Sequence, residues 1–297
     1  MSVFNENGAL IYANNSGISN VSLDSIIAES ARMDRIIESM TMEAIGQFNA
    51  ANIVLETTGY VNESFKEVAK NAWTTAINAL LKALDNVIEF FNGLGRFKHI
   101  ISINKKKITD KFNEAKNSDN EKLKACAKAY NAVSKFNSKD LLEKIEAGIK
   151  LTNQKALSAD AYAETLGFSR QGDWKMDIDR ALSASSNPSD SMSSININNA
   201  IETATTFDKN IPTIKQKRRD VEKSLKDIEK LTKSGSDTSN MPDKAGLGMV
   251  SYYCVTAIKT LRLLASSSTK LCMAILNFKT SKKKDSKSDD SDTTEEE

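Results

Sequence analysis

Hydrophobic residues between Asn62 and Phe91 recur at the spacing of an α-helix, and this is the strongest pattern in the chain. On a helical wheel the apolar side chains form one arc, and polar side chains fill the remainder. The arc covers about half of the circumference, which is more than a helix at a protein surface needs. We therefore predict the central helix of a bundle, or a helix that buries this face against a partner or a membrane.

Residue types also predict where this helix begins and ends. Asn62 is a favourable N-cap, and Glu63 places a negative charge at the positive end of the helix dipole. Gly93 and Gly95 follow the last apolar residues, and glycine commonly ends helices. The prediction is therefore a helix from Asn62 to Phe91.

The same periodicity predicts helices on both sides of the central one. Ser22 is placed to cap a helix over residues 23–49. Pro212 is placed just inside the start of a highly charged helix, where its missing N–H costs nothing. The other apolar-rich patterns cover residues 97–112, 123–136, 138–149, 156–170 and 249–278.

Composition divides the chain into two helical regions and a charged tail. Residues 181–195 are rich in serine, contain Pro188 and hold few large apolar side chains, which favours a linker. We therefore predict an N-terminal helical bundle in residues 1–180 and a C-terminal helical region in residues 196–280. Residues 281–297 are lysine-rich and then acidic, and we predict that both ends of the chain are disordered.

Overall composition favours an all-α fold. Three prolines and 12 glycines in 297 residues are few, which favours long helices over strands and turns. The net charge of +2 gives no field that attracts nucleic acid, so a specific nucleic-acid ligand is not expected. The 3 cysteines are widely spaced, which favours buried thiols over disulfides. No signal peptide or conventional membrane span is visible.

No arrangement of residues predicts a catalytic, cofactor or metal site. His99 is the only histidine, and no acid or nucleophile lies at the spacing of a catalytic triad. The Gly-Leu-Gly sequences at 93–95 and 246–248 are too short to cradle a phosphate, and helix boundaries are the favoured interpretation. Residues 177–179 lack the glycine and terminal glutamate of a calcium loop. We therefore expect no enzyme activity, no cofactor and no metal.

Lysine-rich helices leave a second interpretation open. Residues 215–219 (KQKRR) are followed by acids, which favours a solvated helix face over a nucleic-acid patch. Residues 62–112 and 249–284 each combine an apolar face with a lysine cluster, as helices in a membrane interface do. Core packing with a basic rim is the favoured interpretation, and membrane contact is the alternative.

The first 115 residues combine an early helix rich in Met, Ala and Glu (33–45) with Trp73, an aromatic pair at 90–91 and a lysine-rich stretch at 105–112. In this order they resemble structural or internal virion proteins of large tailed bacteriophages of Gram-positive hosts. The resemblance implies a non-enzymatic component of the particle that is made in the host cytoplasm. It also implies that its partners are other virion proteins or further copies of itself.

Together these patterns predict an all-α protein that acts through protein–protein contacts in a virion. The apolar faces of the central and C-terminal helices provide the candidate interaction face. Its residues are Trp73, Leu80, Leu84, Phe91, Leu261, Leu264 and Ile275. The alternative is a membrane-active helical protein, of the pore-forming, toxin or ejection type, that inserts amphipathic helices.

Overall fold

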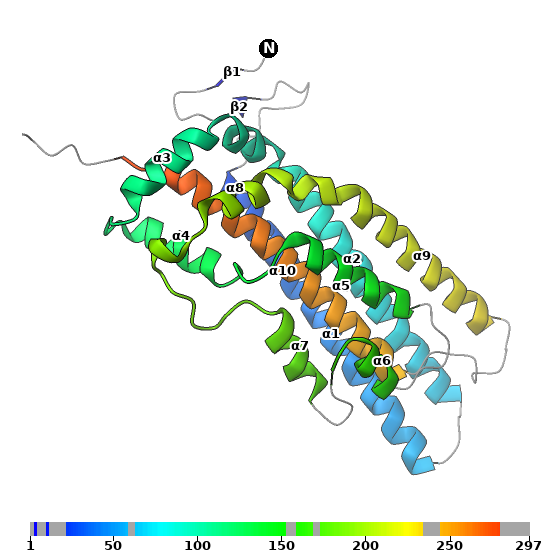
Figure 1. The fold of residues 1–297 in the computed structure, drawn as a ribbon. Coiled ribbons are helices and arrows are strands. Elements are labelled where there is room, and N and C mark those ends of the chain that lie inside the picture. Colours follow the sequence, from blue (N-terminus) through cyan, green and yellow to red (C-terminus); the bar gives the residue numbers. More distant parts are fainter. Residues whose placement is uncertain are drawn as a thin grey trace, which may run out of the picture.

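The computed structural model describes residues 3–4, 10–11, 22–58, 63–152, 159–168, 173–233 and 244–279. Within these ranges the chain is almost wholly helical and forms an elongated bundle (Figure 1). This confirms the all-α prediction. The disorder predicted for residues 281–297, and for most of the N-terminal end, concerns residues outside the described ranges.

Ten α-helices and two short strands make up the described part of the chain. Strand β1 (Val3–Phe4) pairs antiparallel with β2 (Leu10–Ile11). The helices are α1 (Leu23–Thr58), α2 (Glu63–Ile103), α3 (Lys105–Ala115), α4 (Glu121–Asn131), α5 (Ser138–Thr152), α6 (Ala159–Thr165), α7 (Trp174–Leu182), α8 (Ile197–Thr206), α9 (Ile211–Lys233) and α10 (Lys244–Leu276). Short 3-10 helices cover Met192–Ser194 and Phe207–Asn210.

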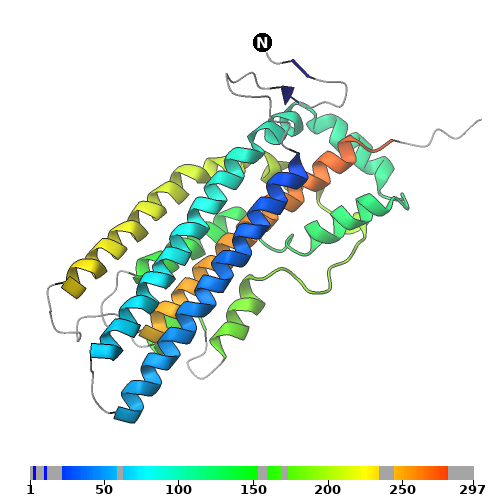
Figure 2. The same ribbon diagram turned by 180° about the vertical axis from the view of Figure 1, so that it is seen from behind.

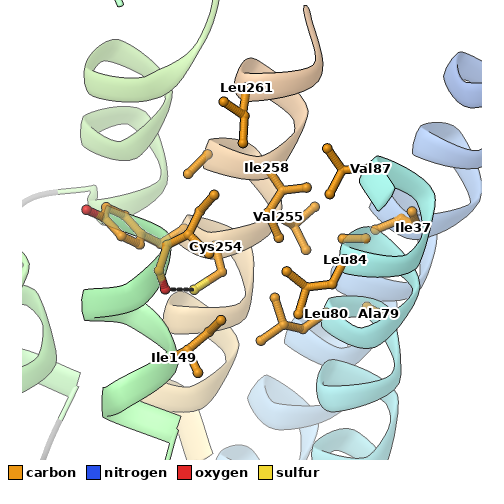
Figure 3. Packing of buried hydrophobic residues seen from close by; sticks show 14 of the residues in the cluster. Ile37, Ala79, Leu80, Leu84, Val87, Ile149, Cys254, Val255, Ile258 and Leu261 are labelled. Atoms are coloured by element: carbon orange, nitrogen blue, oxygen red, sulfur yellow. Dashed lines mark hydrogen bonds between the residues drawn. The ribbon is translucent and has the colours of Figure 1, made fainter. Parts of the chain in front are cut away.

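Helix α10 lies inside the bundle, where α2 and α5 make its most extensive contacts and α1 and α8 follow (Figures 1 and 2). From residue 246 to residue 276 none of its side chains is exposed. Figure 3 shows Leu80 and Leu84 of α2 facing Val255 and Ile258 of α10, with Ile37 of α1 behind them. The prediction gave the central position to residues 62–91. Most apolar side chains of that segment from residue 69 onward are buried in the core, but its polar side is exposed, so α10 is the more enclosed helix.

Small hydroxyl side chains explain why α10 is more buried than its hydropathy suggests. Thr269 Oγ1 donates to the Ala265 carbonyl of its own helix at 2.8 Å. Ser251 Oγ donates across the bundle to the Ala76 carbonyl of α2 at 3.1 Å. A buried hydroxyl that finds a carbonyl acceptor avoids most of the cost of leaving water. These residues therefore lie in the core although they are polar.

Helix α2 begins as predicted but does not end at its glycines. It continues through Gly93 and Gly95 to Ile103, because Leu94 and Ile101 extend the buried apolar stripe. A glycine in a helix interior costs about 1 kcal/mol relative to alanine, which the burial of two large side chains outweighs. Asn104 then ends the helix, and its side-chain Nδ2 donates to the Ile100 carbonyl at 2.9 Å.

Two predicted helix starts are confirmed. Helix α1 begins at Leu23, and Ser22 Oγ accepts a hydrogen bond from the backbone N–H of Ser25 at 3.0 Å. Pro212 is the second residue of α9. The first N–H groups of every helix lack partners within the helix. Ser22 accepts a hydrogen bond from one of them, and Pro212 has no N–H to satisfy.

Residues 181–195 do not separate two domains. One hydrophobic cluster contains residues from both sides of this segment, among them Trp73 and Leu261. The segment itself packs on the bundle, since the Ser185 N–H donates to the Ala132 carbonyl at 2.8 Å and Met192 is buried. The predicted N-terminal and C-terminal units are therefore parts of one bundle, because α10 completes the core of the helices before it.

We predict opposite effects for two glycine-to-alanine substitutions. At Gly148 of α5 an added Cβ would lie 2.3 Å from Sγ of the buried Cys254, whereas at Gly95 nothing lies within 4 Å. Gly148→Ala is expected to lower the free energy of unfolding by about 1–3 kcal/mol through overpacking. Gly95→Ala is expected to raise it by about 0.5–1 kcal/mol through the gain in helix propensity. Urea unfolding measures both, and equal effects would contradict the close α5–α10 contact.

Candidate functional site

Three ion pairs join α1 to α10 and form the most distinctive polar feature of the bundle. Asp24 pairs with Lys270 at 2.9 Å, Asp34 pairs with Arg262, and Glu38 pairs with Lys259. Residue numbers rise on one helix as they fall on the other, so the two helices run antiparallel. We call these three pairs the α1–α10 charge seam. The sequence places the three basic residues near one another on α10, and the structure supplies their acidic partners.

The middle pair of the seam lies in the core. The side chains of Arg262 and Asp34 are 3% and 10% exposed. Asn86 of α2 donates through Nδ2 to Asp34 Oδ1 at 3.0 Å and to the Ser30 carbonyl at 3.2 Å. Ser30 Oγ returns a hydrogen bond to Asn86 Oδ1 at 3.1 Å. The guanidinium of Arg262 lies 5.5 Å from the centroid of the Phe90 ring. These contacts fix α1, α2 and α10 in one register.

Electrostatics at Asp34 reflect two opposing effects. Burial raises the pKa of its carboxyl above the ordinary value, and the adjacent Arg262 charge counteracts this. Arg262 Nε and Nη1 have no hydrogen-bond partner among the described residues. Burying two charges is costly, so such a pair serves mainly to select one arrangement of the helices. Removing one member leaves the other uncompensated in the core.

A cleft of about 420 Å³ lies beside the seam, between α1, α7 and α10. Four of its ionisable side chains bind to one another in pairs, and the Nζ of a fifth, Lys175, lies 5.6 Å from the centroid of the Tyr252 ring. Lys259 pairs with Glu38, and Tyr252 Oη donates to Asp179 Oδ1 at 2.7 Å. Burial and this hydrogen bond raise the pKa of Tyr252, so the phenol stays protonated at neutral pH. Within the described residues the cleft thus lacks a free acid–base pair of the kind that catalysis requires.

A second cleft of about 410 Å³ lies at the other end of the seam, where Asp24 and Lys270 border α4. Cys126 lines it and is partly buried. Burial raises the pKa of the Cys126 thiol, and a protonated thiol is a weak nucleophile. Among the described residues no group of three or more His, Cys, Asp or Glu side chains is placed to hold a metal ion.

The seven residues of the predicted interaction face lie inside the fold. Each of them is at most 2% exposed. Six belong to the cluster that joins α2 to α10, and Ile275 belongs to a neighbouring cluster that includes Ile108 and Phe112. The apolar arcs of α2 and α10 cover each other, so in this fold neither is free for another protein. The face predicted from the sequence is therefore a core face of the chain itself.

The basic stretch at 215–219 is held by acids of other helices. Lys217 Nζ lies 3.1 Å from Glu146 Oε1 of α5, and Arg218 Nε lies 2.5 Å from Asp85 Oδ1 of α2. These pairs attach α9 to the bundle and neutralise two of its charges. The arrangement supports the interpretation of this stretch as a helix face over that of a nucleic-acid patch. His99 is exposed on α2.

Searches against protein-family models, curated proteins and solved structures find no match to this chain. The resemblance of residues 1–115 to virion proteins therefore stays a prediction. Among the described residues, none of the helices is both long enough and apolar enough to cross a membrane.

The buried pair of the seam generates a prediction for stability. Arg262→Met or Asp34→Ala alone is expected to lower the free energy of unfolding by about 3–5 kcal/mol, because each leaves the partner charge buried without compensation. The double variant is expected to lose much less than the sum of the two losses. Urea unfolding of the unmodified chain, the two single variants and the double variant gives the coupling free energy between Asp34 and Arg262.

The exposed pair Glu29–Arg32 is the matched control, since its side chains are 63% and 59% exposed. Replacing Glu29 or Arg32 by alanine is expected to leave the urea midpoint unchanged, because solvent screens the pair. Strictly additive losses at Asp34 and Arg262 would show that the two side chains act independently and would contradict the seam.

Because several tyrosine and cysteine side chains are buried in their neutral form, we predict that the free energy of unfolding decreases in alkali. Burial raises the pKa of Tyr130 and of Tyr253 from 10.0 to about 12, and that of Cys272 from 9.0 to about 12. At a pH between the ordinary and the raised pKa of each group, the folded chain holds a proton that the unfolded chain releases. The free energy of unfolding therefore falls as pH rises through this range. Urea midpoints measured from pH 9 to pH 12 test this. Tyr130→Phe should flatten the decline, and an unchanged slope would contradict the assignment.

Proposed function

We propose that this protein is a non-enzymatic structural component of a bacteriophage virion and acts through protein–protein contacts. The resemblance of its first 115 residues to structural or internal virion proteins is the basis for proposing a bacteriophage particle. The geometry of the bundle supports the non-enzymatic part of the proposal. Its place is in the head or attached to the shell or tail, and it is made in the host cytoplasm.

One observation carries the non-enzymatic part: acidic side chains inside the bundle are held by charged and polar side chains of other helices. Asp34 is engaged by Arg262 and Asn86, and Asp179 by Tyr252. Catalytic side chains also bind one another, but at least one of them must reach a bound substrate, and a buried Asp34 held by both Arg262 and Asn86 does not. Ion pairs that hold helices in register instead give a rigid building block.

The shape of the described bundle suits such a role. Helices α1, α2 and α10 contain 36, 41 and 33 residues. At about 1.5 Å per residue they span roughly 50–60 Å, so the molecule is a rod with long sides. Because the large apolar faces are buried, partners must bind the polar outer surface. A stable contact of this kind needs about 800 Å² on each partner, which the sides of such a rod can provide.

Quantitative mass spectrometry of purified particles tests the proposal. The chain is expected at a fixed copy number relative to the major shell protein in particles purified through a density gradient and washed at high salt. A fixed ratio is expected because a structural component occupies defined positions in the assembly. Lysine labelling before and after disassembly then compares exposed side chains, such as Lys144 and Lys223, with the partly buried Lys217.

The control is the same measurement on a host protein of similar abundance in the lysate. Recovery of the chain in the soluble fraction only, or a ratio that varies between preparations as the host protein does, would contradict a structural role. An exposed lysine that is labelled equally in the particle and in the free protein would exclude its own face from the contact.

A further inference from the structure

Ile103 is the most exposed large hydrophobic residue among those the structure describes. Its side chain is 65% exposed, compared with 58% for Met176 and 41% for Met42. It is the last residue of α2. The junction of α2 with α3 lies at the end of the bundle away from α6 (Figure 1). Its neighbour Ile101 is fully buried, so Ile103 is an exception in a strongly apolar segment.

The backbone on both sides of Ile103 is fixed. The Asn104 N–H donates to the Ile101 carbonyl at 3.1 Å, and the Asn104 carbonyl accepts from the Ile108 N–H at 2.9 Å. Ile108 and Phe112 anchor α3 in the hydrophobic cluster that also contains Ile101 and Ile275. Ile103 therefore stays on the surface while its neighbours are held in place.

Three consecutive lysines, Lys105, Lys106 and Lys107, follow at the start of α3, and all three are exposed. They have no ion-pair partner among the described residues, whereas nearby Lys98 pairs with Asp208. Positive charges in the first turn of a helix oppose the helix dipole and repel one another. Helix stability therefore does not account for them. We call Ile103 and these three lysines the α2–α3 corner.

We propose that the α2–α3 corner docks on a membrane surface rich in anionic phospholipids. Lysines near such a surface each strengthen binding, by about fivefold per residue. An isoleucine gains by leaving water for the boundary between headgroups and acyl chains. Phosphates of a nucleic acid would attract the lysines equally but would leave Ile103 in water, so the exposed isoleucine favours the bilayer.

This contact needs no opening of the bundle. The sequence alternative of a membrane-active protein requires the apolar faces of α2 and α10 to leave the core that they share. The α2–α3 corner is already on the surface, and the buried residues stay where they are. The contact is independent of the proposed virion role, because it depends only on exposed side chains of the folded chain.

Vesicle flotation with the full-length chain tests the contact. The probes are vesicles of phosphatidylcholine with and without phosphatidylglycerol, at low and at raised salt. We expect binding only to the anionic vesicles and weaker binding at raised salt, because the lysine contribution is screened. Replacing Lys105, Lys106 and Lys107 by glutamine should weaken binding by about 100-fold, and Ile103→Ser by about tenfold.

Matched variants control for charge and for apolar surface. Replacement of Lys144, Lys215 and Lys223 by glutamine removes the same charge from exposed positions that have no ion pair among the described residues. Met176→Ser removes a side chain of similar exposure on α7. Both controls should bind the anionic vesicles within about threefold of the unmodified chain, because surface charges separated by more than a Debye length act weakly.

Three outcomes would overturn the proposal. One is no binding of the unmodified chain to anionic vesicles. A second is an equal loss in the control with Lys144, Lys215 and Lys223 replaced. The third is an Ile103→Ser variant that binds normally, together with binding of a DNA duplex that competes with the vesicles. Circular dichroism should show that all variants keep the helical content of the unmodified chain and that none melts at a lower temperature, because every substituted side chain is exposed.

Discussion

The enclosure of most of α10 by other helices is the constraint on which the rest of the structure depends. Polar groups on a largely enclosed helix are costly unless most of them find partners inside the protein. Hydroxyls such as those of Ser251 and Thr269 use backbone carbonyls. Its charged residues need opposite charges, and Asp24, Asp34 and Glu38 of α1 provide them. The position of α1 follows from this demand as much as from its apolar stripe.

Helical periodicity is a local property, and the structure agrees with the sequence wherever local properties decide. The starts of α1 and α9 follow from the Ser22 cap and from Pro212. The end of α2 does not, because Leu94 and Ile101 gain their burial from helices distant in sequence. The division at residues 181–195 fails for the same reason. A serine-rich segment is a linker only if few contacts cross it, and composition does not record contacts.

The candidate site illustrates the same limit. The basic residues of α10 are visible on one side of a helical wheel, and the acids of α1 recur within a helical pattern. Nothing local says that these two stripes meet, since Arg262 and Asp34 are separated by 228 residues. The predicted interaction face fails for a related reason. A wide apolar arc shows that a helix is covered, and only the fold shows that α2 and α10 cover each other.

The pairing of α1 with α10 has a consequence for biosynthesis. Arg262 is the 228th residue after Asp34 in the chain. At about 5–20 residues per second, the ribosome adds it roughly 10–45 s after Asp34. During this interval the nascent chain presents the apolar face of α2 with only α1 and the intervening helices to shield it. Folding of the core is thus largely post-translational, and the emerging chain is a natural client for chaperones that bind exposed apolar segments.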